Sequence, residues 1–138
     1  MESLKVRDYM HTHPVTFSPD ASLSVALDTL LASKQTGGPV VDALGKVIGF
    51  ISEQDMMHTL LNVGYHCQDT HSVRDCMRTD VLAASVNESI IDLAGRMVSG
   101  KPKLYPVVEG EKLVGLITRR DVLKAISAHL GACFKHPV

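Results

Sequence analysis

Two stretches of the chain place a hydroxyl and a carboxylate at the same spacing, directly after a short apolar run. Ser52 precedes Asp55 by three residues, and Thr118 precedes Asp121 by three. At a helix start this spacing is typical of a capping box, in which each side chain bonds the other residue's backbone N–H. The same start could bind a phosphate through unpaired N–H groups and the helix dipole, while the carboxylate held the two hydroxyls of a ribose. The two interpretations are compatible, because a capped helix start can face a cleft.

The sequence around these residues is itself repeated. Three pairs of segments match in the same order: Val6–Met10 with Val73–Met77, Pro39–Val41 with Pro106–Val108, and Gly49–Asp55 with Gly115–Asp121. We call the first pair the openings and the last pair the endings. Self-similarity in a fixed order indicates a duplicated structural unit.

The elements that must position the endings can be read in each half. Apolar residues at helical spacing predict helices over 23–31 and 90–98, with Asp20 and Asn87 as N-caps. Gly37-Gly38 and Gly100 are expected to end these helices.

Extended segments are expected at 14–17 and 81–83, and strands at 39–41, 47–51, 106–108 and 113–117. The final helices should run from Ser52 to about Leu61 and from Thr118 to about Leu130. Each half then reads β-α-β-β-α, which predicts an α/β (α+β) fold. The expected domains are 1–61 and 73–130, with a connector at 62–72 and a frayed tail at 131–138.

The composition is that of a globular protein, with 138 residues of which 45% are hydrophobic and 21% charged. No apolar run approaches the roughly 20 residues that span a bilayer. The start of the chain lacks a secretory apolar region, so we expect a cytoplasmic protein. Three cysteines far apart argue against a disulfide framework. A net charge of −1 gives no electrostatic reason to expect nucleic-acid binding.

The sequence contains none of the common catalytic patterns: no Gly-rich phosphate loop, no His-Glu-x-x-His and no nucleophile with an adjacent base. We therefore do not expect an enzyme. His66, Cys67, His71 and Cys76 have a spacing that fits no common zinc pattern, so no metal site is expected. We also expect no tightly bound cofactor.

The matched openings, Pro-Val-Val segments and endings resemble a tandem pair of cystathionine-β-synthase-type (CBS) domains, also called a Bateman module. The resemblance covers about residues 4–128. It implies two β-α-β-β-α units packed through their sheets with pseudo-two-fold symmetry, adenine-nucleotide binding in clefts between them, and dimerisation. It also implies a regulatory, energy-sensing role towards an enzyme, channel or transporter. No effector domain accompanies the pair, so a free-standing module is expected.

In that family each cleft combines the ending of one repeat with the opening side of the other. For the second ending the resemblance implies a site whose residues are Thr118, Arg119, Arg120, Asp121, His13, Pro14, Val15, Gly37, Gly38 and Pro39. The arginines can pair with phosphate, which favours this cleft as the tighter site.

For the first ending the implied site residues are Ser52, Asp55, Asp80, Val81, Leu82, Lys103, Leu104 and Tyr105. Glu53 and Gln54 stand where the other ending has arginines, which removes positive charge. Tyr105 could stack on adenine, although a tyrosine in the core is the commoner outcome.

The sequence thus predicts a non-catalytic module that binds an adenosine-containing ligand, forms a homodimer and signals to an unidentified effector protein. AMP is the first choice of ligand, because one phosphate matches one helix start and an arginine; ADP, ATP and S-adenosylmethionine stay open. Two alternatives remain: a structural dimerisation module with empty clefts, and a divalent-ion sensor.

Overall fold

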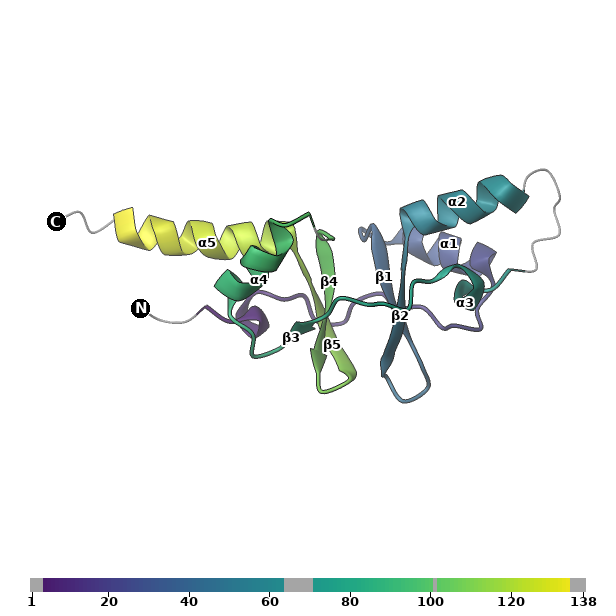
Figure 1. Ribbon diagram of the computed structural model, residues 1–138, viewed down its shortest axis with the longest axis horizontal. Helices are drawn as coiled ribbons and strands as arrows, with labels where there is room; N and C mark the ends of the chain where they lie inside the picture. Colours follow the sequence, from purple (N-terminus) through teal and green to yellow (C-terminus); the bar gives the residue numbers. More distant parts are fainter. Residues whose placement is uncertain (1–3, 64–70, 101, 135–138) are drawn as a thin grey trace. The chain divides into compact units, whose positions relative to one another are not determined.

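The computed structural model describes residues 4–63, 71–100 and 102–134 (Figure 1). Its elements follow the predicted order: η1 Val6–Asp8, α1 Leu23–Ala32, β1 Gly37–Val41, β2 Val47–Ser52, α2 Glu53–Val63, α3 Val73–Cys76, β3 Ala84–Ser85, α4 Ile90–Met97, β4 Leu104–Glu109, β5 Lys112–Thr118 and α5 Arg119–Phe134. The predicted fold of mixed helices and strands is confirmed. Cys67 and most of the connector, and the end of the tail, lie outside the described residues.

The chain forms two compact units, and the opening of each repeat lies in the unit that holds the ending of the other repeat. We call these two segments the exchanged openings. The first unit holds the segment up to His13 together with 83–110 and the chain from Val114, and the second holds Pro14–Leu82 with Glu111–Leu113. In Figure 1 the first coloured (purple) segment accordingly lies among the green and yellow elements. Each unit thus contains the opening of one repeat and the ending of the other.

Each unit has its own sheet. In the second unit β1 and β2 pair antiparallel, with a bulge at Val40/Val41, and Phe17 bridges to Val40 in parallel. In the first unit the strand order is β3-β4-β5, and Ala84 of β3 pairs with Val107 of β4, also in parallel. The equivalent pairings confirm the repeat at the level of strand register.

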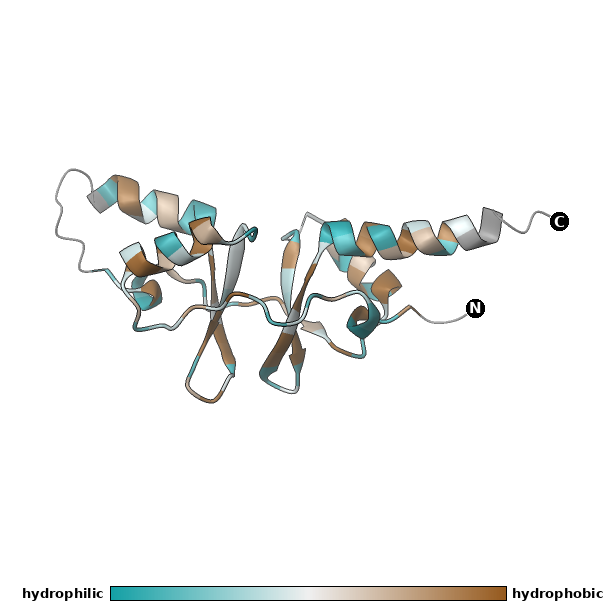
Figure 2. Cartoon of the chain, turned by 180° about the vertical axis from the view of Figure 1, so that it is seen from behind, coloured by the Kyte–Doolittle hydropathy of each residue, from teal (hydrophilic) through white to brown (hydrophobic). Residues whose placement is uncertain are grey.

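Each unit also has its own apolar core. The core of the first unit is built from α4, β4, β5 and α5, with Leu93, Tyr105 and Ile117 at its centre. The core of the second unit centres on Leu23, Leu30 and Ile51. Figure 2 shows apolar residues concentrated along the strands, whereas apolar and polar residues are mixed along the helices. These cores hold the strand ends from which the two endings start.

The helices α1 and α4 begin at Leu23 and Ile90, as predicted, but their N-cap residues differ from the prediction. The N-caps are Ser22 and Ser89, whose hydroxyls accept from the N–H groups of Val25 and Ile91. The predicted caps, Asp20 and Asn87, each lie two residues earlier and contact arginines of the openings instead: Asp20 with Arg74, and Asn87 with Arg7.

The reason for the shift is a tertiary contact. The N–H of Leu23 donates to the carbonyl of His71, and the N–H of Ile90 donates to the carbonyl of Leu4. A carbonyl just before each exchanged opening therefore fixes where each helix begins.

The prediction that Gly37-Gly38 ends α1 is wrong, because both glycines lie in β1 and the helix stops at Ala32. A Cβ on Gly38 would lie 2.7 Å from the Phe17 ring, so a side chain has no room there. Gly100, with a φ of +83°, follows α4 as predicted. The last helices end slightly later than predicted, at Val63 and Phe134.

Each core has one aromatic ring between two neighbouring parallel strands, but the ring comes from a different strand in each core. In the second unit the large Phe17 lies against Gly38, whereas in the first unit the equivalent positions hold the small Ala84 and the large Tyr105. The aromatic ring has thus moved from one strand to its parallel neighbour. This exchange explains why Tyr105 is fully buried.

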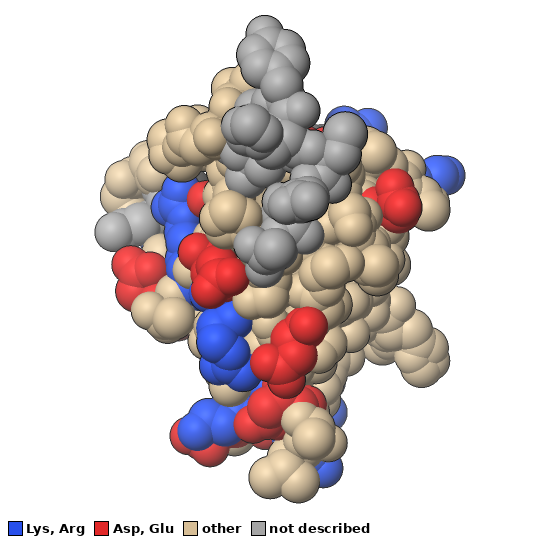
Figure 3. Space-filling model, turned by 90° about the vertical axis from the view of Figure 1, so that its right-hand side faces the viewer, with Lys and Arg blue, Asp and Glu red and all other residues tan. Residues whose placement is uncertain are grey.

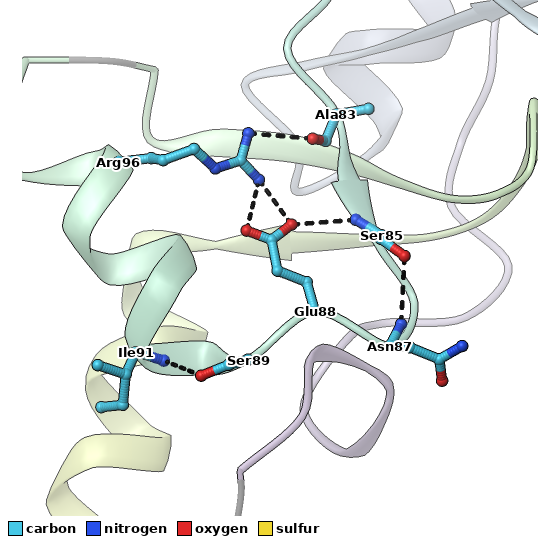
Figure 4. A network of polar contacts seen from close by, with 7 residues as sticks. All are labelled: Ala83, Ser85, Asn87, Glu88, Ser89, Ile91 and Arg96. Carbon is cyan, nitrogen blue, oxygen red and sulfur yellow. Dashed lines mark hydrogen bonds and ion pairs between the residues drawn. The ribbon is translucent and has the colours of Figure 1, made fainter.

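A charged network lies over the Tyr105 ring. The Arg96 guanidinium sits 5.2 Å from the ring centroid and binds both carboxylate oxygens of Glu88, at 2.7 and 2.8 Å. Figure 4 shows the same guanidinium donating to the carbonyl of Ala83 while Glu88 accepts from the N–H of Ser85. The network ties β3 to α4, and it leaves the Tyr105 hydroxyl without a hydrogen-bond partner among the described residues.

Replacing Tyr105 by phenylalanine should leave the protein as stable or stabilise it, because a buried hydroxyl without a partner costs about 1–3 kcal/mol. Burial raises the pKa of Tyr105 above its usual value of 10. The folded state therefore binds the Tyr105 proton more tightly than the unfolded state does. The free energy of unfolding falls as the pH rises above 10, because the unfolded state then loses this proton first. Urea unfolding at pH 8 and pH 10.5 should show a smaller loss for Tyr105→Phe than for the unmodified protein. An equal loss would contradict the burial.

Candidate functional site

Both endings form complete capping boxes. The Asp121 Oδ2 accepts from the Thr118 N–H at 2.8 Å and from its hydroxyl at 2.9 Å, and the Asp121 N–H donates to that hydroxyl at 3.1 Å. Ser52 and Asp55 make the same three bonds at 3.0, 2.8 and 3.1 Å. One carboxylate oxygen of each aspartate is therefore fully used in the box.

The second carboxylate oxygen of each aspartate contacts the side chain of the residue that directly follows an exchanged opening. The His11 Nε2 lies 2.8 Å from the Asp121 Oδ1, and the Arg78 Nε lies 3.2 Å from the Asp55 Oδ1. The aspartate side chains are nearly buried, at 6% and 13% exposure, whereas both His11 and Arg78 are 63% exposed. Each site thus combines a nearly buried acceptor, held by its capping box, with an exposed partner.

The residues after each opening reach the aspartates because a glycine lets their backbone come close. His11 pairs with Leu116 through two backbone hydrogen bonds, of 2.7 and 2.9 Å. A Cβ on Gly115 would lie 2.6 Å from the His11 carbonyl and 2.9 Å from the Met10 sulfur.

The second unit repeats this arrangement. Arg78 pairs with Phe50, and a Cβ on Gly49 would lie 2.6 Å from the Met77 sulfur. The glycine of each ending and the methionine of each opening are therefore complementary.

The helix starts offer fewer free donors than the sequence suggests. The Arg119 N–H donates to the carbonyl of Lys103 at 2.8 Å, and the Glu53 N–H donates to that of Thr36 at 2.9 Å. The N–H groups of Asp121 and Asp55 are used in the capping boxes, and so are the hydroxyl hydrogens of Thr118 and Ser52. The expectation that these N–H groups are unpaired is wrong, so a phosphate would depend mainly on side chains.

Arg119 and Arg120 are both exposed at the start of α5 and so can reach an anion. Glu53 and Gln54, their equivalents in the other ending, are also exposed. A hollow of about 410 Å³ lies beside the first ending and is lined by Gln54, Asp55, His58, Thr59, Asp75, Cys76 and Arg78. Its mixed charges favour a polar occupant over an apolar one.

The other residues predicted with the second ending fall in two groups. His13 belongs to the first unit, is exposed and has a φ of +57°, an uncommon conformation for a residue with a side chain. Pro14, Val15, Gly37, Gly38 and Pro39 belong to the second unit. There the Gln35 side chain holds Val15 and Gly37 together, with bonds of 2.8 and 3.2 Å to the Val15 backbone and 3.0 Å to the Gly37 carbonyl.

The residues predicted with the first ending are also divided. Asp80, Val81 and Leu82 share the second unit with Ser52 and Asp55, and Asp80 and Leu82 are exposed. Lys103, Leu104 and Tyr105 belong to the first unit. Of the two outcomes considered for Tyr105, stacking on adenine or a place in the core, the structure shows the second, because the ring is fully buried in the core of its own unit.

Sequence reasoning missed three residues of this arrangement: His11, Arg78 and Gln35. A usable signal was present for the first two, since each directly follows the methionine of an opening and each can carry a positive charge. Gln35 has no such signal, because its repeat equivalent is Pro102.

The described residues contain no group of three or more His, Cys, Asp or Glu side chains that could hold a metal ion. None of the helices found in them is long and apolar enough to cross a membrane. On the face shown in Figure 3, acidic and basic residues lie beside one another and form no patch of a single sign.

Known proteins share the sequence and the fold. A family model for the CBS domain matches residues 6–62 and 73–128. The crystal structure of a Vibrio cholerae protein described as AcuB, for acetoin utilization, has a TM-score of 0.83 and 26% identity, and covers 99% of this chain and 100% of that one. CBSX2 from Arabidopsis thaliana, solved in complex with AMP, has a TM-score of 0.77 and 27% identity over 91% of this chain and 97% of that one.

Curated relatives include MJ1225 from Methanocaldococcus jannaschii, which is 29% identical over 123 residues. The match covers 89% of this chain but only 43% of MJ1225, and 33% of the zinc metalloprotease MJ0392 from the same organism. The chain therefore spans less than half of these relatives. Because the family model matches both halves of the chain, in register with the two openings and endings, this protein belongs to the CBS domain family and contains that domain twice.

Proposed function

We propose that this protein is a non-catalytic regulatory module that binds an adenosine-containing ligand at its endings and signals its occupancy to a partner protein in the cytoplasm. The observation that carries the proposal is the pair of capped aspartates, each with a second carboxylate oxygen that contacts an exposed side chain, His11 or Arg78. Similarity to CBSX2, which was crystallised with AMP, supports the choice of ligand.

The geometry suits a ribose. The capping box fixes one oxygen of Asp121, and the other, which contacts the exposed His11, is the acceptor that a ribose hydroxyl would use in place of His11. Arg119 or Arg120 would bind the phosphate as charged side chains. We keep AMP as the first choice, ahead of ADP, ATP and S-adenosylmethionine, and we keep the other predicted residues of both sites, except the Tyr105 ring, in the proposal.

We extend the proposal to a homodimer. An apolar groove of about 320 Å³ lies between α1 and α2, and another of about 450 Å³ lies between α4 and α5. Leu31, Leu61, Val98 and Leu123 are 59–85% exposed in or beside them. Exposed apolar surface of this kind marks protein contacts. A second copy of the chain, or the effector protein, would cover it.

Calorimetric titration with AMP tests the ligand proposal. Asp121→Asn should weaken AMP binding at the second ending about 10- to 100-fold, because hydrogen bonds to a charged group contribute about 1.5–3 kcal/mol. Asp75→Ala is the matched control, since Asp75 bonds Ser72 in another capping box, and it should leave that binding unchanged. Equal weakening by both changes would indicate a general loss of structure. No binding of any of the four ligands at millimolar concentration would favour the structural dimerisation module.

A further inference from the structure

The side chains that contact the two capped aspartates differ in how they titrate. His11 and Arg78 occupy equivalent places in the repeat and make the same contact, with the second oxygen of Asp121 and of Asp55 respectively. Arginine stays charged at all physiological pH values, whereas histidine changes its charge between about pH 5 and pH 8. Only one of the two aspartates therefore has a partner whose charge depends on pH.

The surroundings of His11 leave this contact as its main electrostatic interaction. The elements packed against it are β5, which presents the Leu116 backbone, and the start of α5, which presents the Asp121 carboxylate. The other charged residues and histidines on these elements and on the described part of the segment itself are Lys112, Arg119, Arg120, Lys124, Lys5, Arg7, Asp8 and His13. Among the described residues, Asp121 is the charged group within ion-pair distance of His11.

A ligand hydroxyl and His11 would compete for the same oxygen. The Asp121 Oδ2 already accepts two bonds from Thr118, so Oδ1 is the remaining acceptor. A protonated imidazole adds a charge–charge attraction to its hydrogen bond with a carboxylate, and a neutral imidazole or a hydroxyl lacks that attraction. Protonated His11 should therefore hold this oxygen more firmly, and neutral His11 should give way to a ribose. Arg78 holds Asp55 firmly at every pH.

We propose that His11 makes ligand binding at the Thr118–Asp121 ending depend on pH, with affinity falling as the pH drops from about 7.5 to about 5.5. At the Ser52–Asp55 ending, where His58 and Asp75 also line the hollow, Arg78 keeps binding weak and adds no such pH dependence of its own. The inference rests on the proposed function, because it concerns regulation of the same sites.

The test uses proteins with one intact aspartate. The Asp55→Asn change leaves only Asp121 intact, at the second ending. AMP is titrated at pH 5.5, 6.5 and 7.5 into three proteins that carry this change: one with His11, one with His11→Gln and one with His11→Arg. The AMP phosphate itself titrates near pH 6, so the quantity compared is the ratio of the Kd with His11 to the Kd with His11→Gln at each pH. We expect this ratio to rise about three- to tenfold from pH 7.5 to pH 5.5. His11→Arg should bind weakly at all three values.

The reciprocal change is the matched control. In the Asp121→Asn protein, Arg78→His should introduce the same pH dependence at the first ending. A ratio that is constant with pH, or one that falls at low pH, would overturn the inference while AMP binding itself supported the proposed function. Absence of AMP binding in the unmodified protein would instead overturn the proposed function, so the two failures are distinguishable. Thermal unfolding of each variant without AMP verifies that it is folded.

Discussion

Gly115→Val is expected to lower the free energy of unfolding by about 3 kcal/mol or more. The added Cβ would lie 2.6 Å from the His11 carbonyl, which is a backbone atom that cannot move without breaking its pairing with Leu116. The opening would be displaced from β5, and the contact between His11 and Asp121 would be lost with it. Urea unfolding followed by circular dichroism measures the change.

Gly95→Ala is the control for this experiment. Gly95 lies within α4, and a Cβ there would meet nothing within 4 Å. Alanine is a better helix former than glycine, so this change should raise stability by about 0.5–1 kcal/mol. If Gly115→Val were as stable as the unmodified protein, the opening could not lie against β5 as described.

Phe17→Ala should cost about 3–5 kcal/mol, because it removes a large ring that is only 3% exposed from the core of the second unit. The neighbouring Gly38 has no side chain to fill the space that is left. The first unit shows the alternative solution, with Ala84 and Tyr105 at the equivalent positions.

That alternative gives a rescue experiment. Gly38→Tyr alone should also be strongly destabilising, since its Cβ would lie 2.7 Å from the Phe17 ring. The double change Phe17→Ala with Gly38→Tyr should recover part of the loss, and a double-mutant cycle measures the coupling between the two positions. Losses that simply add would contradict the idea that the two cores exchange one aromatic ring between strands.

The sequence predicts those parts of the fold and site that depend on local pattern. The order of elements follows from hydrophobic periodicity, and the capping boxes follow from the three-residue spacing of Ser52 with Asp55 and Thr118 with Asp121. Both signals lie within a few residues of what they determine, so no knowledge of the tertiary structure is needed.

Features set by distant contacts could not be predicted in this way. Asp20 is a good N-cap residue by type, but the N-cap of α1 is Ser22, because the carbonyl of His71 accepts the N–H of Leu23. Likewise, the helix starts were expected to offer free N–H groups, and the carbonyls of Thr36 and Lys103 use two of them. Comparison of equivalent positions would have identified the buried Tyr105. Tyr105 stands in place of Gly38 and Ala84 stands in place of Phe17, so the Tyr105 ring can fill the space that the Phe17 ring fills in the other core.

The exchanged openings also determine the order in which the protein can fold during synthesis. Most of the second unit, Pro14–Leu82, is made as one continuous stretch. The first unit must wait, because the partner of His11 is Asp121, which follows 110 residues later. At roughly 5–20 residues per second, the first segment leaves the ribosome several seconds before its binding surface exists. The N-terminal segment therefore cannot complete its packing until translation has reached the last helix.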